Sequence, residues 1–285
     1  MITKAQQLRQ LLAGNEVLVA PCAYDALSAK AIEAAGFKLA GTTGYGMHGS
    51  ILGTPDNGLL AFNEMAAALG KMADAVDIPI MADAEGGYGN AINTIRTVRE
   101  FEKAGIAGLF IEDQKLPPNC PFIKATENIS IEEMVGKIKA AADTRRDENF
   151  VIVARTNAPF AEAVERANIY LEAGADMVKV IPKTKEELLA YPSQINGPIH
   201  LGLYANKGIN DGLTATDAVK LGYKIITYPM SCLFAATAAL MSVMNYIKEH
   251  DTDEGYLGMT LSFDEYLQFI GAEKYKELDQ KYLKG

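Results

Sequence analysis

Short apolar runs alternate with helical patterns along most of the chain. Eight runs are rich in Val, Ile and Leu without strict alternation, which is typical of strands buried on both faces. Several helical patterns end in a residue pair whose glycine adopts the left-handed conformation that closes a helix. These pairs are Ala35-Gly36, Ala104-Gly105, Ala173-Gly174 and Leu221-Gly222. The predicted strands are 17–22, 38–43, 78–83, 108–113, 150–155, 177–181, 199–203 and 224–229.

Eight strands that alternate with helices over roughly 250 residues predict an α/β fold, a (β/α)8 TIM barrel. The same pattern leaves an open doubly wound sheet as the alternative. An apolar helix at 231–248 and helical patterns at 263–283 exceed what a barrel needs. We therefore expect one barrel domain, 1–285, with a helical extension from about 250 to 285.

The composition narrows the possible partners. The 285 residues are 49% hydrophobic and carry a net charge of −9, which argues against nucleic acid or an anionic membrane surface as partner. We expect no apolar run long enough to span a bilayer and no signal peptide at the N-terminus. Three widely spaced cysteines favour a reduced compartment, so we expect a cytoplasmic protein.

The stretch 78–90 carries the strongest chemical signal. Asp83 and Glu85 come at the end of an apolar strand, and because residues two apart in a strand point to the same side, both acids can face one spot. Three glycines follow and permit a tight turn with the backbone close to a ligand. Two adjacent carboxylates need a positive partner. Mg²⁺, or Mn²⁺ in its place, meets this need, since such ions bind carboxylates, waters and substrate oxygens.

In a TIM barrel the active site lies at the C-terminal ends of the strands. We therefore expect four or five carboxylates and one arginine to converge there, although any single acid has the alternative of capping the next helix. An arginine is a bidentate clamp for a carboxylate or a phosphonate. The residues at these ends, beyond Asp83 and Glu85, are Thr43, Gly44, Tyr45, Asp56, Glu112, Asp113 and Arg155.

The loop 114–130 contains three prolines and Cys120. Its length in a compact domain predicts a lid over an active site. The Cys120 thiol is a candidate general acid delivered by lid closure, because its surroundings set the reactivity of a thiol. The alternative is a cysteine that only packs.

Two other features predict different chemistry. Gly44–Gly49 matches the dinucleotide fingerprint G-x-G-x-x-G, but it follows the second strand, and glycines and a proline at 53–58 interrupt the helix that should follow. Lys179 in the sixth strand is a candidate Schiff-base lysine, with a surface lysine as the alternative. None of the three histidines has metal-ligand spacing.

Several motifs in combination resemble the isocitrate lyase/phosphoenolpyruvate mutase superfamily. The resemblance covers about residues 15–240. Within it, the chain is most similar to the short bacterial lyases of the methylisocitrate lyase and dimethylmalate lyase type. Its motifs are Thr43-Gly44, Leu52-Gly-Thr-Pro-Asp56, Asp83-Ala-Glu-Gly-Gly-Tyr-Gly89, Ala107-Gly-Leu-Phe-Ile-Glu-Asp-Gln114, Glu132-Glu-Met134, Ala154-Arg-Thr-Asn157 and Tyr228-Pro-Met-Ser231.

The resemblance implies a Mg²⁺-dependent barrel enzyme for a small carboxylate substrate. It also implies a homotetramer that exchanges a C-terminal helix between subunits. By position, Asp83 would bind Mg²⁺, and the ion would be held directly or through water by Glu85, Asp56 and Glu112.

The reaction implied by the resemblance is a retro-aldol cleavage to an α-keto acid such as pyruvate and a carboxylate. Arg155 would grip the carboxylate of the α-keto-acid half, which Thr43, Gly44 and Tyr45 would contact. Cys120 would protonate the carbanion that cleavage leaves.

The chain departs from the family pattern around the thiol and the metal. The lid reads Pro118-Asn-Cys-Pro-Phe122, without the basic residues that usually flank the cysteine. Glu85 replaces a usual Asp and Thr43 replaces a usual Ser, and both keep the functional group.

Three further departures fall in the subsite for the leaving carboxylate. Ile181, Gly202 and Phe234 stand where methylisocitrate lyase has Glu, Asn and Arg. An apolar wall leaves a buried carboxylate unpaired, so we expect an alkylmalate such as 2,3-dimethylmalate, with methylisocitrate also in range. The alternatives are oxaloacetate decarboxylation or hydrolysis, phosphonopyruvate chemistry, and a Schiff-base aldolase that uses Lys179.

Overall fold

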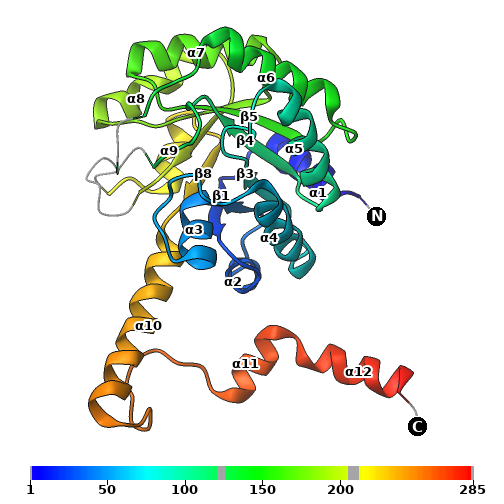
Figure 1. Ribbon diagram of the computed structural model, residues 1–285, viewed down its shortest axis with the longest axis vertical. Coiled ribbons are helices and arrows are strands. Elements are labelled where there is room, and N and C mark those ends of the chain that lie inside the picture. The colour runs from blue at the N-terminus through cyan, green and yellow to red at the C-terminus, as the bar shows by residue number, and fades with distance from the viewer. Residues whose placement is uncertain (1, 121–122, 124–125, 205–211, 284–285) are drawn as a thin grey trace. The chain divides into compact units, whose positions relative to one another are not determined.

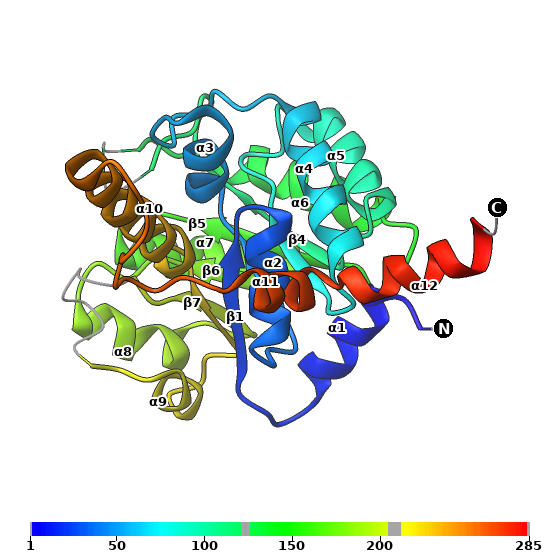
Figure 2. The same cartoon turned by 90° about the horizontal axis from the view of Figure 1, so that it is seen from below.

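Eight parallel strands close into a barrel in the computed structural model, which describes residues 2–120, 123, 126–204 and 212–283. Helices surround the strands (Figures 1 and 2). Pairing runs from β1 to β8 in chain order, and β1 pairs with β8, so the predicted (β/α)8 barrel is confirmed and the open sheet is wrong. The strands are β1 Leu18–Ala23, β2 Ala40–Thr42, β3 Ile80–Asp83, β4 Gly108–Glu112, β5 Val151–Thr156, β6 Met177–Val180, β7 Ile199–Gly202 and β8 Ile225–Tyr228.

The helices around the barrel begin and end on local signals. Ser130 and Thr184 accept a hydrogen bond from the third residue of the helix that each precedes. Gly36, Gly105, Gly174 and Gly222 have φ of +87°, +84°, +108° and +113°, as predicted for residues that end helices. The helices are α1 Lys4–Ala13, α2 Ala26–Ala34, α3 Gly44–Leu52, α4 Phe62–Ala75, α5 Ala91–Lys103, α6 Ile131–Thr144, α7 Phe160–Glu172, α8 Lys185–Gln194 and α9 Ala215–Lys220.

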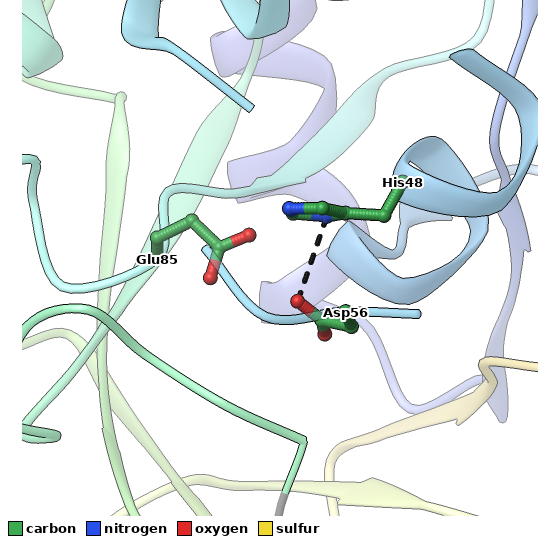
Figure 3. Close-up of side chains that lie close together, drawn as sticks. All are labelled: His48, Asp56 and Glu85. Carbon is green, nitrogen blue, oxygen red and sulfur yellow. Dashed lines mark ion pairs between the residues drawn. The ribbon is translucent and has the colours of Figure 1, made fainter. Parts of the chain in front are cut away.

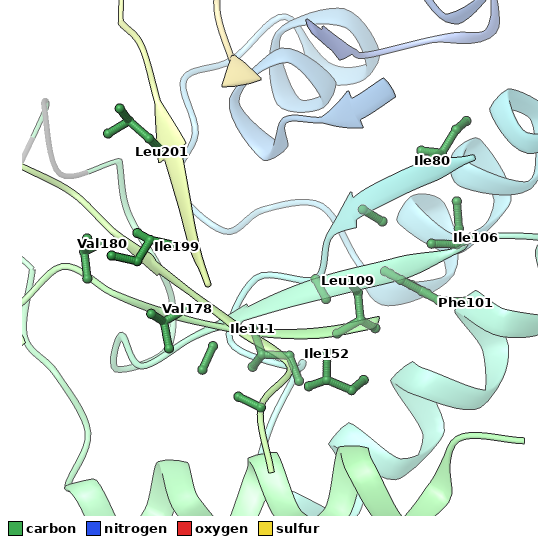
Figure 4. Close-up of a cluster of buried hydrophobic side chains, with 14 of the residues drawn as sticks. Ile80, Phe101, Ile106, Leu109, Ile111, Ile152, Val178, Val180, Ile199 and Leu201 are labelled. Atoms are coloured by element: carbon green, nitrogen blue, oxygen red, sulfur yellow. The ribbon is translucent and has the colours of Figure 1, made fainter. Parts of the chain in front are cut away.

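Two apolar layers hold the barrel together. One lies between strands and helices, where Leu109, Ile111 and Ile152 are fully buried (Figure 4). The other fills the barrel interior and includes Phe110, together with Leu8 of α1. Because apolar side chains occupy the interior, the polar strand-end residues gather at the C-terminal end.

The segment after β2 differs from expectation. We expect a long loop that carries Asp56 after the second strand, but Gly44–Leu52 forms α3, with the Thr43 side chain accepting a hydrogen bond from the Gly46 N–H. Gly53, with φ +65°, ends the helix. A good N-cap and buried tertiary surroundings thus outweigh the low helix propensity of three glycines.

Two consecutive acids at the end of β4 point to opposite sides. Glu112 faces the barrel interior, whereas Asp113 faces the helix layer. Asp113 Oδ2 accepts hydrogen bonds from Arg166 Nη1 at 3.1 Å and from the Tyr170 hydroxyl at 2.8 Å, both on α7. The expectation that Asp113 joins the other acids is therefore wrong, because it ties β4 to α7.

The chain divides into two compact units, Met1–Cys232 and Leu233–Gly285. Helix α10, Ser231–His250, begins in the first unit and continues in the second. The helical patterns predicted at 263–283 are two helices, α11 Phe263–Ile270 and α12 Ala272–Tyr282.

Helix α10 corrects the expectation about apolar length. By length and composition it could cross a membrane, with a mean hydropathy of 1.2 over 18 residues. Helices that pack against other protein surfaces pass the same test, and α10 contains the polar residues Asn245, Lys248 and Glu249.

The Asp113 network gives a stability prediction. Asp113→Ala leaves the Arg166 guanidinium and the Tyr170 hydroxyl without their buried partner, and we expect the free energy of unfolding to fall by about 3–5 kcal/mol. Urea unfolding followed by circular dichroism measures this change. Asp143→Ala, on the exposed face of α6, is the control and should leave stability nearly unchanged. Equal free energies of unfolding for the two variants would contradict a stabilising role of Asp113.

Candidate active site

Asp83 ends β3 and accepts hydrogen bonds from two backbone groups. The Gly44 N–H donates to Oδ2 at 3.1 Å and the Glu85 N–H donates to Oδ1 at 3.0 Å. The carboxylate therefore lies at the N-terminus of α3, where free N–H groups favour an anion. In the Gly44–Gly49 motif, a side chain of the protein itself holds the position that a dinucleotide pyrophosphate would need.

Glu85 lies beside Asp83 and has strained backbone geometry, with φ +50°. A Cβ added at Gly44 would lie 2.5 Å from Glu85 Oε1 and 3.2 Å from Asp83 Oδ2, so the two acids require glycine there. Among the described residues Glu85 Oε1 is buried without a hydrogen-bond partner. Burial, and then the Asp83 carboxylate, raise the pKa of Glu85 well above its ordinary value.

Asp56 approaches the same place from the loop after α3. One ligand-type atom each of His48, Asp56 and Glu85 lie within 4.8 Å of one another, and the three side chains converge in Figure 3. His48 Nδ1 lies 3.5 Å from Asp56 Oδ1. Burial, and then Asp83, raise the pKa of Asp56.

Both ring nitrogens of His48 are already used by the backbone. Nε2 accepts a hydrogen bond from the Leu60 N–H at 3.3 Å, so Nδ1 carries the proton that it donates to the Gly44 carbonyl at 2.9 Å. We therefore interpret His48 as a residue that positions the Asp56 loop. The atoms left to bind a metal ion in this group are the carboxylate oxygens of Asp56 and Glu85.

Glu112 and Arg155 form a buried ion pair across β4 and β5. Arg155 Nη1 lies 3.2 Å from Glu112 Oε2, which also accepts from Gln114 Nε2 at 3.0 Å and from Asn157 Nδ2 at 3.5 Å. Asn157 Oδ1 in turn accepts from Arg155 Nε at 3.3 Å. Burial raises the pKa of Glu112 to about 7, although Arg155 opposes this shift.

Cys120 connects the predicted lid to the loop that carries Asp56. The residue is buried, and its N–H donates to the Asp56 carbonyl at 3.2 Å. Pro121 and Phe122 of the predicted lid motif lie outside the described residues.

Asp56, Asp83, Cys120 and Arg155 line one cavity at the C-terminal end of the barrel, whereas Glu85 and Glu112 lie beside Asp83 and Arg155 outside its lining. The cavity brings together residues predicted at three strand ends, those of β2, β3 and β5, and in the lid, as well as Lys179, which faces inward, so the surface alternative for this lysine is wrong. The lining residues are Cys22, Thr42, Thr43, Tyr45, Asp56, Asp83, Phe110, Cys120, Arg155, Lys179, Tyr204, Pro229 and Met230.

The three positions predicted for the subsite of the leaving carboxylate are divided between the two units. Ile181 and Gly202 are buried in the first unit, and a Cβ at Gly202 would lie 3.0 Å from the Tyr204 ring. Phe234 belongs to the second unit, where 47% of it is exposed.

Sequence reasoning missed Gln114 and Asn157 as parts of the site. Each follows a predicted site residue by two positions, Glu112 and Arg155, so the rule that pairs Asp83 with Glu85 would have found both. No local signal identifies His48, because loop backbone fixes its role.

The donor set fits a divalent metal ion. Carboxylate oxygens are hard ligands of the kind that Mg²⁺ prefers, and the buried, unpartnered Glu85 Oε1 points to a missing positive partner. Asp83, Glu85, Asp56 and Glu112 are the residues that would hold the ion, directly or through water.

The closed barrel and its cavity define a TIM-barrel enzyme, with acids, an arginine and a thiol at the C-terminal end of the strands. Residues 8–248 match the protein family described as phosphoenolpyruvate phosphomutase. The chain therefore belongs to the phosphoenolpyruvate mutase/isocitrate lyase superfamily, whose members use a divalent metal ion.

Individual relatives agree with this assignment. The chain is 40% identical to 2,3-dimethylmalate lyase of Eubacterium barkeri over 99% of both chains. It is 36% identical to 2-methylisocitrate lyase of Aeropyrum pernix over 95% of this chain and 89% of that one. The structure of phosphonopyruvate hydrolase with oxalate and Mg²⁺ matches 99% of this chain and 100% of that chain, with a TM-score of 0.90 and 31% identity.

The raised pKa values predict pH-dependent metal binding. Glu112, with its pKa near 7, and Glu85 take up protons as the pH falls, and a protonated acid does not bind a cation. We expect Mg²⁺ affinity to fall by about tenfold or more from pH 7.5 to pH 6, with proton release on binding. Calorimetry in buffers of different ionisation enthalpy measures both.

Glu112→Gln is the matched variant for this experiment. It removes one titrating group, so its affinity should depend less steeply on pH. Wild-type affinity that stays constant between pH 7.5 and pH 6 would contradict the assignment of these acids.

Proposed function

We propose that the protein is a Mg²⁺-dependent carbon–carbon lyase that cleaves a 2-hydroxy di-acid, most of all an alkylmalate such as 2,3-dimethylmalate. The products are an α-keto acid such as pyruvate and a carboxylate. The observation that carries this proposal is the cavity itself, in which Asp56, Asp83, Arg155 and Cys120 meet. Identity to dimethylmalate and methylisocitrate lyases supports it.

The ion would lie among Asp83, Glu85, Asp56 and Glu112, with Mn²⁺ as a substitute. When bound, it would supply positive charge to the substrate oxygens on which negative charge develops. The four acids would hold it, and His48 and the Gly44 N–H in turn position Asp56 and Asp83.

Arg155 and the end of β2 would orient the α-keto-acid half. Asn157 and Glu112 hold the guanidinium in place through Nε and Nη1, which leaves the remaining N–H groups for a substrate carboxylate. Thr43, Gly44 and Tyr45 complete this side, and Thr43 and Tyr45 line the cavity.

Cys120 is the proposed acid. During cleavage the C2–C3 bond breaks, the 2-hydroxyl proton leaves, and the electron pair of the bond passes to the departing half. Cys120 returns one proton to that carbon, so no net proton is consumed. The hydrogen bond from the Cys120 N–H to the Asp56 carbonyl holds the residue that carries the thiol next to the loop that carries Asp56.

The buried apolar Ile181 and the small Gly202 favour an alkylated di-acid over a tricarboxylate. A third carboxylate against Ile181 would have no partner from that side chain, and burial of an unpaired charge is costly. A Cβ at position 202 would lie 3.0 Å from the Tyr204 ring, so an asparagine there would require this ring to shift.

Other chemistry of the same superfamily stays as an alternative. Oxaloacetate decarboxylation or hydrolysis and phosphonopyruvate hydrolysis or mutation need the same metal and arginine. A Schiff-base aldolase is a second alternative, because Lys179 is buried and burial lowers its pKa to about 8.

We further propose a cytoplasmic homotetramer in which the second unit contacts another copy of the chain. Large apolar side chains of that unit are almost fully exposed, with Leu257 at 98%, Met259 at 95% and Phe263 at 77%. Light scattering coupled to size exclusion measures the subunit number.

A keto-acid release screen tests the reaction. Dimethylmalate, citramalate, methylisocitrate, oxaloacetate and phosphonopyruvate are supplied with Mg²⁺ or with EDTA, and we expect the highest kcat/KM with an alkylmalate and none with EDTA. Asp83→Ala should abolish turnover, whereas Asp143→Ala, on exposed α6, should keep it. Full activity of Asp83→Ala would contradict the metal assignment.

Cys120→Ser tests the proposed proton donor. A hydroxyl is a far weaker acid than a thiol, so we expect kcat to fall by about 10²–10⁴-fold, the usual contribution of a general acid. Cys232→Ser, at a half-buried position, is the control and should retain normal turnover. A near-normal rate for Cys120→Ser would mean that this thiol only packs.

A further inference from the structure

Lys179 is a buried cation without an acidic partner. It lies on β6, is 4% exposed and lines the cavity. In the part of the chain that the structure describes, its ammonium makes no hydrogen bond and no ion pair, and its closest recorded contact is the Phe110 ring, 3.9 Å from Nζ to the centroid. A buried ammonium needs a counter-charge, and a ring face replaces only part of one.

The strand register shows why no neighbour supplies that charge. Glu112, Arg155, Lys179 and His200 are consecutive partners across β4 to β7. Glu112 is already paired with Arg155, and His200 Nε2 contacts the Thr227 hydroxyl at 3.0 Å. Burial, and then Lys179, lower the pKa of His200 well below its ordinary value, so this ring is neutral.

Charge is also divided across the cavity. The acids Asp56 and Asp83 come from the β2 and β3 side, whereas Lys179 and Tyr204 come from the β6 and β7 side. Arg155 on β5 lies between them in the order of the closed barrel. A di-acid with one end at the acids and Arg155 would present its other end to Lys179.

We propose that Lys179 binds the second carboxylate of the substrate, on the half that departs when the C2–C3 bond breaks. This inference rests on the proposed function. The electron pair of the broken bond passes to the departing half and is shared with that carboxylate until the carbon is protonated. Lys179 thus contacts the group on which charge accumulates, and it selects di-acids over mono-acids.

Binding of two matched acids isolates this contact. Methylsuccinate has two carboxylates and no hydroxyl, so it cannot undergo the cleavage, and 2-methylbutanoate has the same skeleton with a methyl group in place of one carboxylate. With Mg²⁺ present, we expect the full-length wild type to bind methylsuccinate about 100-fold more tightly by calorimetry. Lys179→Met should bind the two alike, and Lys179→Arg should recover part of the preference.

Two controls separate recognition from structure. Lys183→Met, at an exposed position just after β6, should keep the wild-type preference. Oxalate, which fits the α-keto-acid side alone, should bind every variant within about threefold, because the loss is confined to one charge contact. In turnover assays, Lys179→Met should raise KM for the di-acid.

The outcomes distinguish this inference from the lyase proposal. A preference for methylsuccinate that Lys179→Met removes supports the subsite even if the wild type cleaves no di-acid, in which case only the lyase proposal fails. A preference that survives in Lys179→Met overturns the inference, and so does loss of oxalate binding in that variant. Borohydride trapping of pyruvate on Lys179 would also overturn it, because the nitrogen would then be a nucleophile.

Discussion

The gathering of carboxylates at one buried end of the barrel is the constraint on which the rest of the structure depends. Each acid is restrained differently: Asp83 by two backbone N–H groups, Glu112 by Arg155, and Asp56 by the loop that His48 fixes. Glu85 Oε1 has no hydrogen-bond partner among the residues described. Uncompensated buried charge opposes folding, so the apolar layers must hold the acids together until a cation binds.

The positions of the acids follow from local sequence, which is why most of the fold and the site could be predicted. Apolar runs fix where the strands lie, and the site residues follow at or just after their ends: Glu85 comes two residues after Asp83 in a left-handed turn, and Asn157 comes directly after β5. The strand ends then meet because parallel strands in a barrel share one C-terminal face.

The failures have a common physical origin in tertiary context. Glu112 and Asp113 look equivalent in sequence, yet the barrel register sends one to the cavity and the other to Arg166 and Tyr170. Helix α3 forms in a glycine-rich segment because Thr43 caps it and the Asp83 carboxylate meets its first N–H. Asp83, Arg166 and Tyr170 lie far along the chain from the residues that they contact, so no local window of the sequence contains these contacts.

The tight packing at Gly108 helps to set the register of β4 against β5, and therefore which β4 side chains face the barrel interior. A Cβ there would lie 2.7 Å from the Val151 carbonyl oxygen, so glycine sets how closely β4 and β5 approach. Glu112 and Asp113 are consecutive, so a shift of the β4 register by one residue would turn Asp113 instead of Glu112 toward the barrel interior. Such a shift would change neither the composition nor the net charge. An engineer who transplants these strands must therefore carry the glycine with them, since an otherwise identical barrel would point the wrong acid inward.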